Sequence, residues 1–312
     1  MSEGQKKKKR ERRKGPLLTL RHLAETALVF CVTLPIALLP YGIATRAGRV
    51  VGLVLYHAFK RRRRIALDNV NGAIARGHLD ASLRAEDVVR EHFKLLGRWS
   101  VELVRVLYGK DEALIRQMPV EGKELFDAAL ARGKGILGVT AHLCNWELMG
   151  MSSSALLGPV NAIARRQSNP YMDWFINRVR AKYGGRVIYK EGALKDFLSI
   201  LKGGGVAGVL FDQASSPHQG ILVDFLGAPA WTMRTPVALA RRTGAAVVPI
   251  FMRPVPGGYY KFVVLPEVEI TEDEVADTRR LLSVLEEEIR LNPPMWLWIH
   301  RRWKNVPGAK TY

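Results

Sequence analysis

The sequence predicts an α/β fold in which a mixed, largely parallel sheet is covered by helices on both faces, behind an N-terminal membrane-anchoring helical segment. Two observations predict it. From about residue 81 onward, short apolar runs alternate with longer segments of helical spacing, as in parallel sheets with crossover helices. Nearer the amino terminus, residues 26–45 carry no charge over about the length that crosses a bilayer core.

Two features of the amino-terminal part argue against a simple membrane-spanning helix. Basic runs lie on both sides of the uncharged stretch, at residues 6–14 and 60–64, and positively charged flanks both favour the cytoplasm. Pro35 and Pro40 would also kink a helix there. We therefore expect a tilted, re-entrant or in-plane anchor. A clean transmembrane helix and a buried core helix stay open as alternatives.

The rest of the chain reads as one domain, so we divide the protein into an arm, residues 1–64, and a single α/β domain, residues 65–312. Helical spacing predicts helices at 81–108, 122–132, 145–157, 169–184, 191–204, 235–244 and 271–293. Apolar runs predict strands at 135–140, 160–165, 186–189, 206–212, 221–226, 245–252 and 259–265. Thr271 and Glu274 match a capping box at the start of the last helix.

Composition narrows the classes of function. The 312 residues are 48% hydrophobic and 25% charged, which is typical of a globular protein. The net charge of +19 predicts polyanionic partners. The basic runs lack the interleaved aromatic residues that stack on bases, so a membrane surface is favoured over nucleic acid. Two cysteines, Cys31 and Cys144, exclude a disulfide scaffold. We find no P-loop and no zinc-binding helix.

One histidine lies where open α/β folds bind ligands. The predicted strand 135–140 ends just before His142, and Glu147 follows near the start of a helix. Such a histidine can act as a general base when a carboxylate orients its ring. A histidine and a glutamate that merely cap a helix would show the same pattern, so the pair alone decides nothing.

Longer motifs around this pair resemble a known family. The segment HLCNWELMG (142–150) resembles the His-x4-Asp/Glu motif of the late lipid A acyltransferases, the lauroyl and myristoyl transferases that complete lipid A. ARRQSNPYMDW (164–174) resembles their Arg-x3-Asn-Pro-x2-Asp segment, and GVLFDQ (208–213) their Asp-Gln turn. Residues 225–251 and MWLWIHRRWK (295–304) resemble two further family segments. The resemblance covers most of residues 20–305, in order.

The resemblance implies an enzyme that moves a fatty acyl chain from an acyl-carrier-protein thioester to a hydroxyl of a lipid A precursor or related anionic glycolipid. His142 would be the general base, supported by Glu147, with direct transfer and no covalent intermediate, so that Cys144 is a packing residue. The implied substrate-binding residues are Arg165, Asn169, Asp212, Gln213, His300, Arg301 and Arg302. No metal and no cofactor beyond the thioester is expected.

The same resemblance implies an acidic carrier protein and an anionic lipid as partners, at the cytoplasmic face of a bacterial inner membrane. Two departures bear on the acceptor: Arg166 stands where the family often has proline, and Ala214 and Ser215 follow the Asp-Gln pair. Acyl transfer to another lipid, such as a phospholipid, an ornithine lipid or another glycolipid, stays open. So do thioester hydrolysis and a catalytically silent membrane-binding protein of the same fold.

Overall fold

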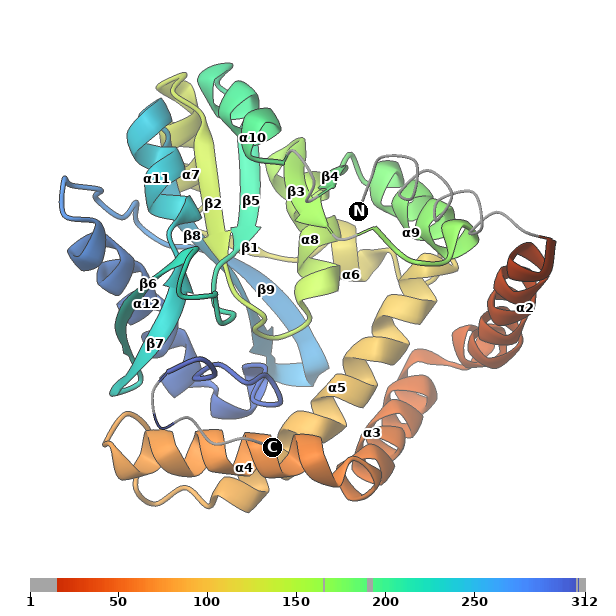
Figure 1. Cartoon of the computed structure of the whole chain (residues 1–312). Helices are drawn as coiled ribbons and strands as arrows, with labels where there is room; N and C mark the ends of the chain where they lie inside the picture. Colours follow the sequence, from red (N-terminus) through yellow and green to blue (C-terminus); the bar gives the residue numbers. More distant parts are fainter. Residues whose placement is uncertain (1–15, 165, 190–192, 307, 309–312) are drawn as a thin grey trace.

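The computed structural model describes residues 16–164, 166–189, 193–306 and 308. The basic run at 6–14 and Arg165 therefore lie outside the described residues. Figure 1 shows a twisted sheet flanked by helices, with the amino-terminal helices at one edge of the molecule.

The described strands form one seven-stranded sheet and a separate two-stranded hairpin. Within the sheet, β8, β2, β5, β3 and β4 run parallel, while β9 is antiparallel to β8 and carries β1 beside it. This confirms the mixed, largely parallel sheet. In spatial order the strands are β1 (Val120–Glu121), β9 (Tyr259–Val264), β8 (Ala246–Val255), β2 (Ile136–Thr140), β5 (Val206–Leu210), β3 (Val160–Ala164) and β4 (Arg186–Tyr189). The hairpin pairs β6 (Gly220–Phe225) with β7 (Ala228–Met233).

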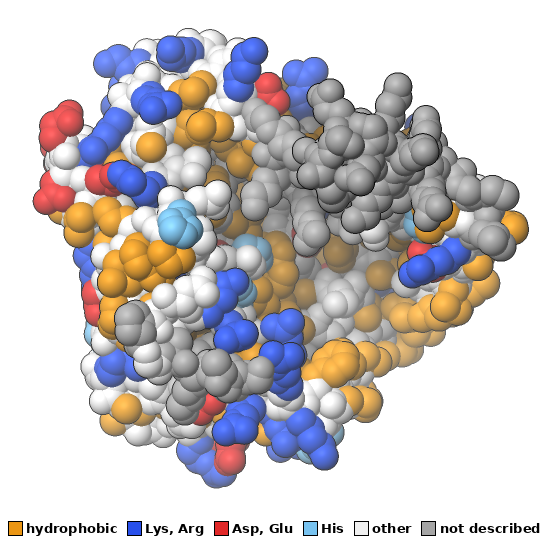
Figure 2. Space-filling model, in the orientation of Figure 1, with side chains coloured by type: hydrophobic (Ala, Val, Ile, Leu, Met, Phe, Trp, Pro, Cys, Tyr) orange, Lys and Arg blue, Asp and Glu red, His pale blue; other side chains and the backbone are white. Residues whose placement is uncertain are grey.

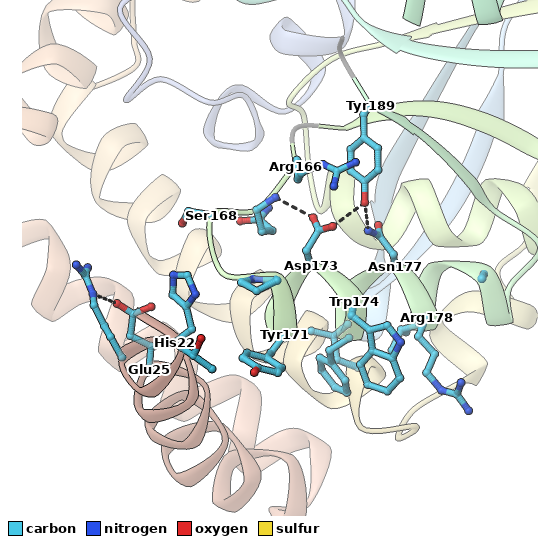
Figure 3. A pocket seen from close by; sticks show the side chains of 18 of the residues that line it. His22, Glu25, Arg166, Ser168, Tyr171, Asp173, Trp174, Asn177, Arg178 and Tyr189 are labelled. Carbon is cyan, nitrogen blue, oxygen red and sulfur yellow. Dashed lines mark hydrogen bonds and ion pairs between the residues drawn. The ribbon is translucent and has the colours of Figure 1, made fainter. Parts of the chain in front are cut away.

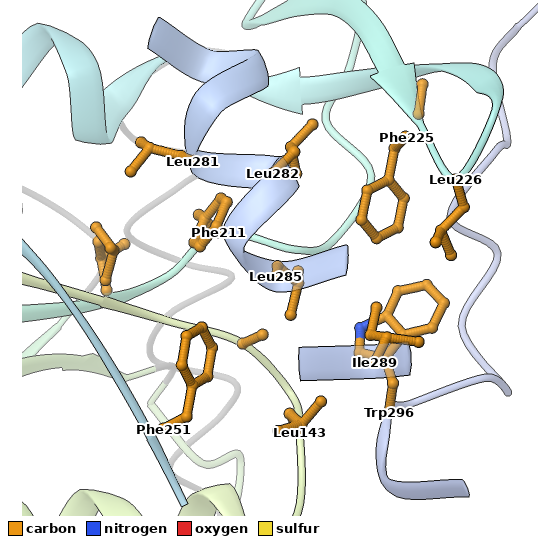
Figure 4. Close-up of a cluster of buried hydrophobic side chains, with 14 of the residues drawn as sticks. Leu143, Phe211, Phe225, Leu226, Phe251, Leu281, Leu282, Leu285, Ile289 and Trp296 are labelled. Atoms are coloured by element: carbon orange, nitrogen blue, oxygen red, sulfur yellow. The ribbon is translucent and has the colours of Figure 1, made fainter. Parts of the chain in front are cut away.

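Helices cover both faces of the sheet, as expected. Successive residues of β2 show why: Leu137 and Val139 belong to one buried cluster and Ile136 to another, because side chains alternate across a strand. The first cluster includes α4 (Lys60–Ala75), α10 (Ala193–Lys202), α11 (Thr235–Thr243) and α12 (Glu274–Leu291). The second includes α6 (Ala113–Arg116), α7 (Lys123–Ala131) and α8 (Trp146–Leu157). The long helix α5 (Ala85–Leu107) contributes to both clusters. Figure 4 shows the part of the first cluster where leucines of α12 lie beside Phe211, directly after β5, and Phe251 of β8.

The uncharged amino-terminal stretch is divided between two helices, α2 (Pro16–Leu38) and α3 (Tyr41–Ala58). The break lies just before and at Pro40, which precedes the first residue of α3. Among the described helices, one segment, Leu18–Leu38, is long and apolar enough to cross a membrane. Its apolar side chains are mostly exposed, so the alternative of a buried core helix does not hold in this structure.

Helix α3 packs closely along α5 through glycines. A Cβ added at Gly52 would lie 2.1 Å from the carbonyl oxygen of Phe93, and one at Gly97 would lie 2.0 Å from that of Gly48. Small residues at such a crossing let two helix backbones approach closely. The expected domain boundary after residue 64 falls inside α4, so the structure continues across it without a break.

The structure corrects the start of the last helix. Helix α12 begins at Glu274, and its N-cap is Asp273, whose side chain accepts hydrogen bonds from the backbone N–H groups of Val275 and Ala276 at 3.0 Å. Thr271 instead donates its hydroxyl to Asp277. The capping box predicted at Thr271 is therefore wrong, because a better-placed carboxylate two residues later satisfies the free N–H groups.

Candidate active site

Two adjacent parallel strands bring His142 and Asp212 together. In the pairing of β2 with β5, Thr140 lies opposite Leu210. His142 and Asp212 each follow two residues later, so both side chains emerge at the carboxyl edge of the sheet, where open α/β folds bind ligands. The Nδ1 atom of His142 lies 2.8 Å from Oδ1 of Asp212.

Asp212 is held in place by a second donor. The carboxylate is almost fully buried, and its Oδ2 accepts a hydrogen bond from Nε1 of Trp296 at 2.9 Å. Burial alone would raise the pKa of the Asp212 carboxyl, but the hydrogen bonds from His142 and Trp296 outweigh it and hold that pKa below its usual value. Asp212 is therefore a carboxylate at neutral pH, and His142 donates its Nδ1–H to it.

That tautomer leaves the Nε2 lone pair of His142 as the free base. The ring is partly exposed, with 20% of the side chain accessible. The side-chain amide nitrogen of Gln213 lies 3.1 Å from Nε2, so Gln213 occupies the position that an acceptor hydroxyl would take. Trp146 lies edge-on to the imidazole, with ring centroids 5.3 Å apart. His142 and Gln213 were both predicted as site residues.

Glu147 is placed differently from the expectation. Its carboxylate accepts a hydrogen bond from Arg180 at 2.8 Å, and Arg180 lies on α9 (Pro170–Lys182). Among the described residues, the side chains that contact the His142 ring nitrogens are those of Asp212 and Gln213. In this structure the carboxylate that contacts the His142 ring is therefore that of Asp212, which was expected to bind substrate. Glu147 instead joins the start of α8 to α9.

The turn that follows His142 is fixed by the carboxyl-terminal segment. The backbone N–H of Leu297 donates to the carbonyl of His142 at 3.0 Å, and that of Cys144 donates to Met295 at 2.9 Å. Cys144 adopts a left-handed backbone conformation, with φ of 56°, and its side chain is fully buried. Burial raises the pKa of the Cys144 thiol. A buried, protonated thiol is a poor nucleophile, in keeping with the packing role expected of it.

A buried carboxylate on α5, which was not predicted from the sequence, also holds this turn in place. Glu102 is fully buried. It accepts hydrogen bonds from Arg98 at 2.7 Å, Tyr260 at 2.6 Å, Asn145 at 3.0 Å and Tyr41 at 3.0 Å. Asn145 is in turn the N-cap of α8. The network thus links the first residue of α3 to the first turn of the helix behind His142.

Of the carboxyl-terminal residues predicted to bind headgroups, Arg302 is fully buried, whereas His300 and Arg301 are partly buried. His300 accepts a hydrogen bond from the backbone N–H of Ala214 at 3.1 Å, and burial lowers its pKa to about 4. Arg302 is fully buried and donates to the carbonyl of Trp231 and to Thr232; burial lowers its pKa to about 10. Arg301 lines a separate cavity of about 540 Å³ beside α4.

Two other predicted residues belong to the segment before α9. Asn169 is the N-cap of α9, and its side-chain amide donates to the carbonyl of His22 at 2.9 Å and to Thr26 at 3.1 Å. Asn169 thereby attaches α2 to α9. Arg165 lies outside the described residues. Within the described part of the chain, no cluster of three or more His, Cys, Asp or Glu side chains could hold a metal ion.

The space-filling view shows how this site meets the surface. Figure 2 shows histidine side chains in a central hollow, with Lys and Arg side chains gathered below it. Apolar side chains line the edge that α2 and α3 form in Figure 1.

Comparison with known proteins identifies the family of this chain. The model of the bacterial lipid A biosynthesis acyltransferase family matches residues 13–305. The lipid A biosynthesis palmitoleoyltransferase of Escherichia coli K12 is 26% identical over 276 residues, 88% of this chain and 89% of that protein. The E. coli K12 lauroyltransferase is 28% identical over 273 residues, covering 86% and 88%. A phosphatidylinositol mannoside acyltransferase of Mycobacterium tuberculosis H37Rv is 27% identical over 214 residues, covering 66% and 67%. The chain belongs to the bacterial lipid A biosynthesis acyltransferase family and is an acyltransferase.

Proposed function

We propose that the enzyme transfers a fatty acyl chain from an acyl-carrier-protein thioester to a hydroxyl of a lipid A precursor or a related anionic glycolipid. The observation that carries this proposal is the Asp212–His142 pair at the carboxyl edge of the sheet, with the His142 side chain partly exposed and its Nε2 beside the amide of Gln213. Family membership supports the reaction and the class of acceptor. The mycobacterial relative keeps a different glycolipid open as the acceptor.

The reaction begins at Nε2 of His142. Gln213 gives up its hydrogen bond to that nitrogen, and the acceptor hydroxyl takes its place. Nε2 removes the hydroxyl proton as the oxygen attacks the thioester carbonyl carbon. The carbon–sulfur bond then breaks, and the imidazolium returns the proton to the leaving thiolate, so the products are an ester and a free carrier thiol. Asp212 stabilises the imidazolium between these two steps.

Charge develops on the thioester oxygen during attack, and hydrogen-bond donors must meet it. The displaced amide of Gln213 is one such donor, since it starts 3.1 Å from the base. We assign the family arginine, Arg165, to the same oxygen or to an acceptor phosphate, on the strength of its motif. Glu147 then acts through Arg180 by holding α9 beside the reacting groups.

We further propose that the enzyme works at the cytoplasmic face of the bacterial inner membrane. Helices α2 and α3 and the residue after them expose apolar side chains at Leu20, Leu23, Leu28, Val29, Val32, Leu34, Leu38, Ile43, Val50, Val51, Val54 and Phe59. Soluble monomers rarely expose a continuous patch of this kind. The basic run 60–64 follows this apolar surface at the start of α4, where it can meet anionic headgroups. The net charge of +19 also suits an acidic carrier.

The proposal is tested with purified enzyme, an acyl-carrier-protein donor and a lipid A precursor, with the product measured by mass spectrometry. His142→Ala should lower the rate at least about a hundredfold, the low end for a lost general base. His218→Ala, in an exposed loop, is the matched control and should keep the wild-type rate. Near-normal turnover by a folded His142→Ala variant would contradict the assignment of the base.

A further inference from the structure

A large cavity lies between the amino-terminal helix and α9. It has a volume of about 1850 Å³, and its lining comes from α2, from the segment before α9, from α9 itself and from Tyr189 at the end of β4. Figure 3 shows His22 and Glu25 of α2 on one side and the side chains of α9 on the other. None of the residues that contact the His142 ring lines this cavity.

The cavity combines cations with aromatic faces. The guanidinium of Arg166 lies over the ring of Tyr189 at 4.1 Å, and that of Arg178 lies over Trp174 at 5.6 Å. Stacking leaves the edge of a guanidinium, with its N–H donors, free to bind an anion. Trp174 is 63% exposed, which is unusual for so large an apolar residue.

Hydroxyl-binding groups lie beside these cations. The phenol of Tyr189 donates to Asp173 at 2.6 Å and accepts from the amide of Asn177 at 2.9 Å, as the dashed lines in Figure 3 mark. The other carboxylate oxygen of Asp173 accepts a hydrogen bond from the backbone N–H of Gln167 at 2.8 Å, and both Asp173 and Asn177 line the cavity. Aromatic faces with carboxylate and amide side chains are the groups that bind sugar rings and their hydroxyls.

One face of α9 carries both residues that line this cavity and the residue that contacts Glu147. Asp173, Asn177 and Arg180 are spaced four and three residues apart, so they share one side of the helix. Asp173 and Asn177 meet Tyr189 in the cavity, while Arg180 reaches Glu147, five residues after His142. Helix α9 therefore joins the wall of the cavity to the helix that follows His142.

The other wall of the cavity comes from the anchor. Asn169 fastens α9 to the carbonyl of His22, and Phe30 packs edge-on against Phe175 with ring centroids 5.1 Å apart. The polar side chains of α2, Arg21, His22 and Glu25, line the cavity, and the exposed apolar residues Leu28 and Val32 follow one and two turns later. A lipid whose chains lie beside the apolar part of α2 would present its headgroup to the cavity.

We propose that this cavity binds the phosphorylated sugar headgroup of the acceptor lipid, with Arg166 and Arg178 each on a separate phosphate, Trp174 against a sugar ring, and Asp173 and Asn177 on hydroxyls. The inference rests on the proposed function and adds to it the site and the residues that select the acceptor. A donor thioester also carries a phosphate, in its phosphopantetheine arm, so the test must separate the two substrates.

The experiment measures KM for three substrates with the full-length enzyme: a phosphorylated lipid A precursor, the same lipid after phosphatase treatment, and the acyl-carrier-protein donor. The double variant Arg166→Ala/Arg178→Ala should raise KM for the phosphorylated lipid at least about tenfold, the low end for lost hydrogen bonds to a charged group. KM for the dephosphorylated lipid and for the donor should stay at the wild-type values. Trp174→Ala should raise KM for both lipids. Arg242→Ala, an exposed arginine on α11 outside the cavity, is the control and should change none.

The outcomes distinguish the two proposals. If wild-type enzyme acylates neither lipid, the proposed function fails. If wild-type enzyme acylates the phosphorylated lipid and the double variant keeps its KM, the headgroup site is wrong while the function stands. A rise in the donor KM alone would assign the cavity to the carrier arm and would also overturn the inference.

Discussion

Replacing Asp212 with asparagine tests the orientation of the base most directly. The carboxylate accepts from two donors, Nδ1 of His142 at 2.8 Å and Nε1 of Trp296 at 2.9 Å. Asparagine keeps the size but has a single carbonyl oxygen. If that oxygen stays on Trp296, the new NH2 group faces Nδ1, which then must accept a hydrogen bond. The imidazole proton moves to Nε2, and the atom that should remove the hydroxyl proton no longer has a lone pair.

The expected fall in kcat for Asp212→Asn follows from the loss of general-base catalysis and the loss of a negative charge. The wrong tautomer removes general-base catalysis, which contributes about 10²–10⁴-fold. Each tenfold loss in rate corresponds to about 1.4 kcal/mol of activation free energy, so the variant should lose about 3 to 5.5 kcal/mol of transition-state stabilisation. The negative charge that stabilises the imidazolium is lost in the same substitution. We therefore expect kcat to fall with little change in KM for either substrate.

The assay is steady-state acyl transfer by the purified variant, with circular dichroism to verify folding. Glu147→Gln is the matched control, because Glu147 contacts Arg180 and lies outside the described contacts of the imidazole. It should raise KM for the lipid more than it lowers kcat. If Asp212→Asn keeps a wild-type kcat while Glu147→Gln loses a hundredfold, the assignment of the orienting carboxylate is refuted, and Glu147 is the partner of His142 during turnover.

Three further predictions concern packing, pH and membrane topology. Gly52→Ala should lower the free energy of unfolding by about 1–3 kcal/mol in thermal melts, since its Cβ would lie 2.1 Å from the backbone oxygen of Phe93; an unchanged melt would show that α3 and α5 are not packed this closely. Burial lowers the pKa of His92 from 6.5 to about 4, so between these pH values the unfolded chain binds a proton at His92 and the folded chain does not. The free energy of unfolding should therefore fall by about 3 kcal/mol as the pH drops from 6.5 to 4. His92→Asn should make the free energy of unfolding depend less on pH over this range. Cysteines placed at Ser2 and Ser82, with the native cysteines removed, should both be shielded from an impermeant thiol reagent in intact cells, and labelling at Ser2→Cys from outside would rule out the in-plane or re-entrant anchor.

Much of the fold was predictable because apolar runs and helical spacing mark buried strands and amphipathic helices. Helix α4 and strand β7 were not predicted, and each of them lacks such a pattern. Helix α4 opens with five consecutive basic residues, 60–64, and its buried side chains, Ile65, Ala66, Val70 and Ala73, form a short stripe among polar residues. Strand β7 contains Pro229 and lies in the two-stranded hairpin outside the main sheet, where a proline is tolerated.

The candidate site was predictable as a set of residues but not as a set of contacts. His142 follows one predicted strand, Asp212 ends another and Gln213 comes directly after it, and motif spacing marked each of the three. Their partnership depends on β5 lying next to β2 with Thr140 opposite Leu210, and strand order is a tertiary property. Proximity in sequence favoured Glu147 instead, but the turn before α8 directs that side chain toward Arg180.

The aromatic and basic segment 295–304 also contributes to this site, although it lies far from His142 in the sequence. The carboxyl-terminal segment contacts the turn after His142 through the backbone of Leu297, and the indole of Trp296 shares Asp212 with His142. Arg302 then fastens that segment to the hairpin by donating to Trp231 and Thr232 from a fully buried position. On the opposite side, Glu102 holds the turn from α5. The imidazole is therefore oriented by elements that lie far apart in the sequence, and that is the kind of rigid support that keeps a general base in position before its substrate arrives.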